Sequence, residues 1–147
     1  MNRVSSLLAV LAALASCVLS APACAKTPAV RRPPAASTPP PGSAERKAIL
    51  DALCVPVERS YHAHVVFVVS YLKAGAGYAY VDAVAQRPNG KPFADQDEGT
   101  GGFLSAMLQK QGGRWRVLKW GSYGGTDLID ECRKKYPRAP AGLLPNG

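Results

Sequence analysis

Few side chains in this chain of 147 residues have the type and spacing that chemistry requires. The foremost is Asp82, a carboxylate inside the aromatic stretch YAYVDA. In a strand beside Phe67, Tyr71 and Tyr80 it could act as an acid or a base, because apolar surroundings favour the protonated form of a carboxylate. The alternative is a carboxylate that is hydrogen-bonded to a tyrosine or faces water. These four residues are the predicted ligand-binding set.

The other acid, base and nucleophile patterns are incomplete. His62 and His64 are spaced i, i+2 and would share one face of a strand, as metal ligands can, but Asp82 is expected on the opposite face and no third ligand is evident. The acidic loop 93–102 lacks the ligand spacing of an EF-hand. Ser122 lacks the glycine that a nucleophile elbow has two residues before its serine. The sequence therefore predicts no catalytic residue, no metal site and no cofactor.

The stretch QKQGGRWRVLKW, residues 109–120, mixes tryptophans with basic residues and fits either a nucleic-acid platform or a β-hairpin. Its Gly112-Gly113 pair can take the positive φ angles of a tight type I′ turn. In the resulting register Trp115 and Trp120 point to opposite faces, so they could not form one stacking surface for bases. We predict a hairpin and no nucleic-acid partner.

Periodicity predicts one α+β domain at residues 44–147, built on a four-stranded antiparallel sheet of two hairpins with a helix before it and a helix after it. Ser43 is the expected N-cap of the first helix, and Pro56 is expected to end or kink it. The expected elements are a helix over 43–60, strands over 64–73, 77–86, 103–110 and 114–121, and a helix over 126–136.

The first hairpin decides which apolar residues share a face. A Gly75-Ala76 turn would place Lys73 opposite Tyr78. One face would then hold Phe67, Val69, Tyr71, Tyr80, Asp82 and Val84, and the other Val66, Val68, Leu72, Ala79, Val81, Ala83 and Ala85. Two short helices would not cover two apolar faces, so we expect a partner, a second copy of the chain among the candidates, to bury the face of the tyrosines.

The N-terminus predicts export. Arg3 precedes the apolar run LLAVLAALASCVLS, which has the length of a signal peptide and is short for a membrane span. ACA before Lys26 predicts a signal peptide over residues 1–25 and a periplasmic or secreted protein. The competing LASC predicts lipidation of Cys17 and an anchor in the outer membrane, and only this lipid would attach the protein to a membrane. Cysteine parity favours the first alternative, because it leaves an even pair.

Residues 26–43 are predicted to form a disordered linker. The stretch is rich in proline and nearly devoid of branched aliphatic side chains, so it cannot bury enough apolar surface to offset the entropy of ordering.

The charge of the predicted domain is modest. From residue 44 onward, fourteen lysines and arginines face ten acidic residues, a net charge of +4. This excess suits an anionic envelope component or a protein as partner and does not require nucleic acid.

Cys54 and Cys132 are the cysteines that remain after cleavage at residue 25, and both lie on apolar stripes of predicted helices. If the two helices cover the same face of the sheet, a disulfide could join them, and closing so long a loop would contribute about 4 kcal/mol. The alternative is two separate buried thiols.

The order of helix, four antiparallel strands and helix, with the motifs VVFVVSYL, YAYVDA and GGRWRVLKW, resembles small exported bacterial proteins with an NTF2-like or cystatin-like fold. The resemblance covers residues 44–137. Such folds host both enzymes and non-catalytic modules, so it does not choose between them. We expect an exported, non-catalytic binding or accessory module of the envelope. The alternative is a small-ligand-binding protein or enzyme with a pocket around Asp82, Tyr71 and Tyr80.

Overall fold

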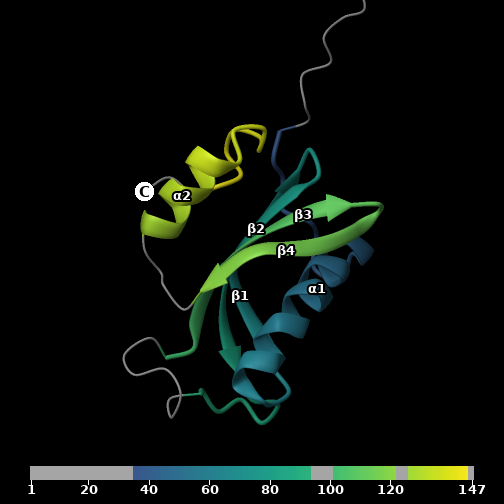
Figure 1. Cartoon of the computed structure of the whole chain (residues 1–147). Coiled ribbons are helices and arrows are strands. Elements are labelled where there is room, and N and C mark those ends of the chain that lie inside the picture. The colour runs from purple at the N-terminus through teal and green to yellow at the C-terminus, as the bar shows by residue number, and fades with distance from the viewer. Residues whose placement is uncertain (1–34, 94–100, 122–125, 146–147) are drawn as a thin grey trace, which may run out of the picture. The chain divides into compact units, whose positions relative to one another are not determined.

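The computed structural model describes residues 35–93, 101–121 and 126–145, and it confirms the predicted α+β class (Figure 1). The four strands form one antiparallel sheet in the order β1-β2-β3-β4. The elements are α1 (Ala44–Tyr61), β1 (Val66–Gly75), β2 (Tyr78–Gln86), β3 (Phe103–Gln111), β4 (Arg114–Gly121) and α2 (Thr126–Lys135). The predictions for the signal peptide, Cys17, the acidic loop and Ser122 fall mainly or wholly outside the described residues.

The first helix begins as expected and continues beyond its proline. The Ser43 side chain accepts a hydrogen bond from the Arg46 backbone N–H, which makes it the N-cap. Pro56 was expected to end or kink the helix, yet α1 continues to Tyr61. Val57 and Tyr61 lie beyond the proline and are buried, so packing stabilises the last turn against the missing backbone hydrogen bond.

The turn of the first hairpin lies one residue later than expected. Its two central residues are Ala76 and Gly77, with φ angles of 47° and 78°, both in the left-handed region that a type I′ turn requires. Lys73 therefore lies opposite Tyr80 rather than Tyr78.

A β-bulge at Ser70 then divides β1 into two parts. The register shifts between Val69 and Tyr71, so the residues before the bulge face the opposite side from the one that uninterrupted alternation would give them. The Ser70 hydroxyl donates to the backbone carbonyl of Asp82, 3.1 Å away. As a result Phe67 does not share a face with Tyr71, and the predicted common face of these two residues was wrong.

A second bulge, at Leu118, corrects the prediction for the tryptophans. Up to this residue the register is the predicted one, with Trp115 opposite Lys110, but beyond it Trp120 lies opposite Ala106 instead of Ser105. Both tryptophans consequently pack against the cluster under α1, and Trp115 is buried. The predicted reason against a stacking surface, that the two tryptophans point to opposite faces, was therefore wrong.

The sheet has a helix on each face (Figure 1). The α1 face, defined by the cluster that contains the buried residues of α1, holds the small residues of β2 expected to accept a close helix. The α2 face carries Leu128 and Cys132 of α2 and Leu143 of the C-terminal segment. The sheet residues buried on the α1 face are Leu72, Ala74, Ala79, Val81, Ala83, Ala85, Leu104, Ala106, Leu108 and Trp115, and those on the α2 face are Tyr78, Tyr80 and Met107.

The segments that flank the helices also contact the sheet. Ser37 pairs with Ala74 through two backbone hydrogen bonds of 2.9 and 2.8 Å, so the described end of the expected linker extends the sheet by one bridge. After α2, the chain returns along the same end of β1, where the Leu143 carbonyl accepts a hydrogen bond from the Tyr71 hydroxyl. Both segments thus lie at the end of the sheet that holds the β1–β2 turn.

Candidate functional site

Three members of the predicted ligand-binding set do lie together on the α2 face. Tyr71 and Asp82 are partners in the β1–β2 register, and the rings of Tyr71 and Tyr80 meet edge to face with centroids 6.1 Å apart. The Ser105 hydroxyl donates a short hydrogen bond of 2.6 Å to Asp82 Oδ1. Sequence reasoning missed Ser105, although its place opposite Asp82 follows once the two hairpins are joined.

This polar group is covered rather than open. Tyr80 is only 1% exposed and packs in the cluster with Leu128, Cys132 and Leu143. Burial, and secondarily the negative charge of Asp82, raise the pKa of the Tyr80 hydroxyl well above its ordinary value of 10. Tyr80 therefore stays protonated and acts as a packed core residue.

The chain itself covers the tyrosines that were expected to need a partner. The expectation failed because the two helices take opposite faces and the C-terminal segment adds Leu143, which is fully buried, beside Tyr71. Substituting Tyr80 with a charged residue would accordingly disrupt the fold rather than an assembly.

The two cysteines are free thiols on opposite sides of the sheet, which corrects the proposed disulfide. Cys54 belongs to α1 and its thiol donates to the Val65 carbonyl at 3.7 Å, whereas Cys132 is buried under α2. The sheet lies between them, so the two sulfurs cannot meet. Burial raises the pKa of both thiols above their ordinary value of 9.0, so neither is an activated nucleophile at neutral pH.

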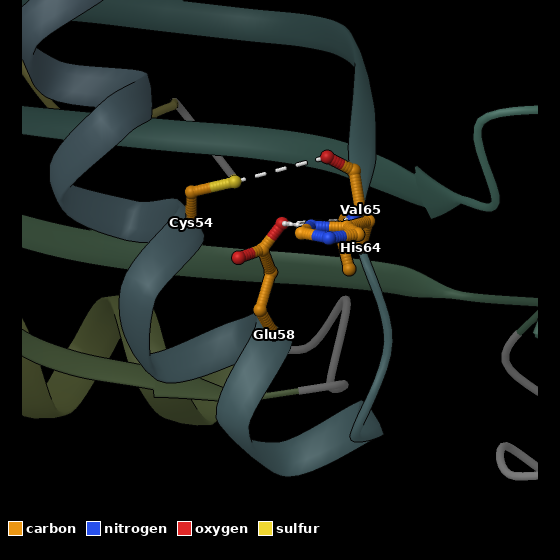
Figure 2. A network of polar contacts seen from close by, with 4 residues as sticks. All are labelled: Cys54, Glu58, His64 and Val65. Carbon is orange, nitrogen blue, oxygen red and sulfur yellow. Dashed lines mark hydrogen bonds and ion pairs between the residues drawn. The ribbon is translucent and has the colours of Figure 1, made fainter.

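A cysteine, a glutamate and a histidine meet where α1 leads into β1 (Figure 2). Glu58 Oε1 accepts the Val65 backbone N–H at 3.1 Å and lies 3.2 Å from His64 Nδ1. This arrangement does not suit thiol catalysis, because the group beside Cys54 is the Glu58 carboxylate and not the imidazole. After burial, this carboxylate is a further cause of the raised pKa of the Cys54 thiol. The arrangement fixes the helix-to-strand connection.

The two histidines do not share a strand face as expected. His62 is the C-cap of α1 with a φ angle of 50°, outside any strand, while His64 contacts Glu58. Within the described residues no three histidine, cysteine, aspartate or glutamate side chains are grouped as metal ligands would be.

A different feature, a cavity of about 880 Å³, lies at the end of the sheet that holds the β1–β2 turn. Its walls are mainly alanine and proline, and its polar groups come from Tyr78, Gln109 and Arg138. Gln111 donates to the Gln109 side-chain oxygen at 3.0 Å, and Gln109 donates to the Tyr78 hydroxyl at 3.1 Å, so a row of hydrogen bonds orients these groups. The lining residues are Ala35, Ala76, Tyr78, Gln109, Pro137, Arg138, Ala139, Pro140 and Ala141.

Further basic residues lie on the elements next to this cavity. Arg116 lies opposite Gln109 in the sheet, and Lys73 Nζ donates to the Gly142 carbonyl at 3.1 Å, next to the lining. The last turn of α2 adds two lysines just before Pro137. We call the cavity with Lys73, Arg116, Lys134, Lys135 and Arg138 the basic end; no acidic residue of the described chain lines its cavity.

Two acidic residues in the middle of α2 form ion pairs with residues outside the basic end. Lys119 of β4 forms an ion pair with Glu131 and lowers the pKa of that carboxyl, and Asp130 pairs with Arg133 at 3.2 Å. Glu131 also interacts electrostatically with Lys135, so α2 offsets part of the positive charge of the basic end. Sequence reasoning missed this site because its members are spread from residue 73 to residue 138; the run RKKYPR was its visible sign.

No protein-family model, curated protein or solved structure matches the chain. Neither of the two described helices has the length and hydropathy needed to span a bilayer.

Proposed function

We propose that the protein is an exported, non-catalytic binding module of the cell envelope and that it binds an acidic sugar polymer at the basic end. The observation that carries this proposal is a cavity of about 880 Å³ whose lining contains an arginine and no acidic residue, with four further basic residues on the elements next to it. A volume of this size is typical of sites for small ligands or for a short part of a larger one.

The chemistry of the lining fits a carboxylated sugar. The Arg138 guanidinium can hold a carboxylate through two parallel hydrogen bonds. The Tyr78 hydroxyl accepts from Gln109 and can donate another hydrogen bond, as sugar hydroxyls require. Proline and alanine side chains offer apolar walls to the carbon face of a sugar ring.

Binding without catalysis is favoured by the state of the reactive groups. The cavity at the basic end is not lined by Asp82, Tyr71 or Tyr80. These residues therefore supply no acid or base to a ligand bound there. Both thiols have raised pKa values, and Glu58 is held by Val65 and His64. The helix followed by an antiparallel four-stranded sheet supports, as part of the proposal, membership of the NTF2-like or cystatin-like folds.

The export proposal has two forms, a periplasmic or secreted protein cleaved after residue 25 and a lipoprotein of the outer membrane anchored at Cys17. Cysteine parity no longer favours the first, because Cys54 and Cys132 are free thiols on helices that pack on opposite faces of the sheet. The mass of the mature N-terminal peptide distinguishes them, since only the lipoprotein begins with an acylated cysteine.

The binding proposal is tested by calorimetric titration of the mature protein with tri-galacturonate, a carboxylated sugar oligomer, beside neutral maltotriose. We expect binding of the acidic oligomer alone, weakened as salt is raised. Arg138→Ala should lower the affinity for the acidic oligomer about tenfold, because it removes one charge-assisted hydrogen bond.

Arg59→Ala is the matched control, because Arg59 is an exposed arginine in the last turn of α1 and does not line the cavity. It should leave the affinity unchanged. Equal losses in both variants, or binding to phosphatidylglycerol vesicles without binding to the oligomer, would contradict an acidic-sugar site.

A further inference from the structure

The outer edge of β1 differs from the outer edge of β4. These two strands are the edges of the sheet. On β4 the exposed residues Arg114, Arg116 and Lys119 place charges along the edge, the common protection against pairing with another sheet. The β1 stretch from Val65 to Leu72 has no charged residue and is rich in β-branched side chains. Nothing in its side-chain chemistry opposes an added strand.

Exposure singles out the first half of this edge strand. Val66 and Val68 are 49% and 52% exposed, and among the described residues Val55 is the only other exposed large hydrophobic. Both valines lie on the α2 face, where Val68 is opposite Val84, a half-buried residue of β2. They form an apolar stripe on a strand edge that the chain's own helices leave exposed.

The chain's own added strand covers only the other half of the edge. Ser37 pairs with Ala74 in antiparallel orientation, and the chain then enters three consecutive prolines, residues 39–41, which have no N–H to donate. The bulge at Ser70 interrupts regular pairing between the two halves. The segment left for pairing is therefore Val66–Val69, because the N–H and the carbonyl of Val65 are already hydrogen-bonded to α1 side chains.

We propose that this segment pairs with the same segment of a second copy, antiparallel about a two-fold axis at Phe67, to form one continuous eight-stranded sheet. An uncharged strand can pair with itself without like-charge repulsion, and a two-fold axis makes the contact self-complementary. Pairing about Phe67 places Val66 of each copy opposite Val68 of the other on one face. It also ends before the bulge. This proposal is independent of the acidic-sugar site.

Sedimentation velocity of the mature protein over a range of concentrations tests the proposal. We expect the wild type to dimerise and Val68→Lys to be monomeric, because the variant places a charge on the apolar stripe. Val55→Lys is the matched control: it changes an equally exposed valine, 58% exposed, on the outer side of α1, and should still dimerise. Circular dichroism should show the same secondary structure in all three.

A compensating variant separates pairing from a general loss of stability. In Val66→Glu combined with Val68→Lys, each glutamate would lie opposite a lysine of the other copy, so the dimer should return and weaken as salt is raised. A wild type that is monomeric at all concentrations would overturn the proposal. So would a double variant no more associated than Val68→Lys, or dissociation by Val55→Lys.

Discussion

Glu58 connects α1 to β1 through a single carboxylate oxygen. That oxygen accepts the Val65 N–H and lies beside His64, and both contacts favour the charged form (Figure 2). The pKa of Glu58 is therefore held below its ordinary value of 4.5, with the Val65 hydrogen bond as the largest cause. The residue adds stability only while it is ionised.

The pH dependence of unfolding should report this contact. Because the pKa of Glu58 is lower in the folded state, its contribution is present above the unfolded pKa and is lost as the pH falls through the folded one. Glu58→Gln should therefore be less stable than the wild type near pH 6, and the difference should shrink between about pH 5 and pH 3. Urea unfolding at a series of pH values measures it.

Glu45→Gln is the control, since Glu45 is an exposed acid in the first turn of the same helix. The difference in the free energy of unfolding between wild type and Glu45→Gln should change less over that pH range. A difference in the free energy of unfolding between wild type and Glu58→Gln that stays constant from pH 6 to about pH 3 would contradict the assigned role.

The two thiols should differ in reactivity and remain reduced. Cys132 is 1% exposed whereas Cys54 is half-buried, and burial raises the pKa of both. Iodoacetamide should therefore modify Cys54 slowly and Cys132 hardly at all in the folded protein, and both in urea. Peptide mapping by mass spectrometry measures each site. A Cys54–Cys132 peptide without reductant would show that the helices do not lie on opposite faces.

The C-terminal segment is as much a part of the α2 face as α2 itself. Leu143 is fully buried beside Tyr71, which donates a hydrogen bond to its carbonyl. Leu143→Ala should lower the free energy of unfolding by about 2–4 kcal/mol, the range for truncating a buried leucine. Leu144→Ala changes the same residue type at a half-buried position and should cost less than about 1 kcal/mol. Equal costs in urea unfolding would show that the segment is not packed.

Sequence periodicity located each helix and strand in the part of the chain that the structure describes, because the periods of 3.6 and two residues are still recognisable when the register is wrong by one residue. It misplaced side chains at the two bulges. Ser70 and Leu118 look like ordinary strand residues, and one extra residue reverses the face of everything beyond it. Phe67 thereby left the predicted site, and Trp120 joined Trp115 under α1.

The sequence also did not allow us to predict which face of the sheet α2 covers. The apolar stripe of a helix indicates that it packs on something, not on which side of a sheet it packs. Cys54 and Cys132 were therefore predictable as partly buried residues but not as residues of helices on opposite faces of the sheet. The basic end depended on the same choice, since α2 on the other face would carry its lysines away from Gln109.

The whole domain separates two kinds of surface. Positive charge gathers at the end of the sheet with the β1–β2 turn, whereas the uncharged edge of β1 lies at its other end, before the bulge. The proposed acidic-sugar site and the proposed dimer contact share no residue, so we expect neither to exclude the other.

The site of binding is read most directly from ¹H–¹⁵N correlation spectra of the mature protein titrated with tri-galacturonate. We predict saturable shifts at the amides of Ala76, Gln109 and Arg138, which line the cavity at the basic end, and unchanged amides at Tyr80 and Asp82. Shifts centred on Tyr71, Tyr80 and Asp82 would instead support a ligand site beneath α2. They would contradict the acidic-sugar site, as would a spectrum that does not change.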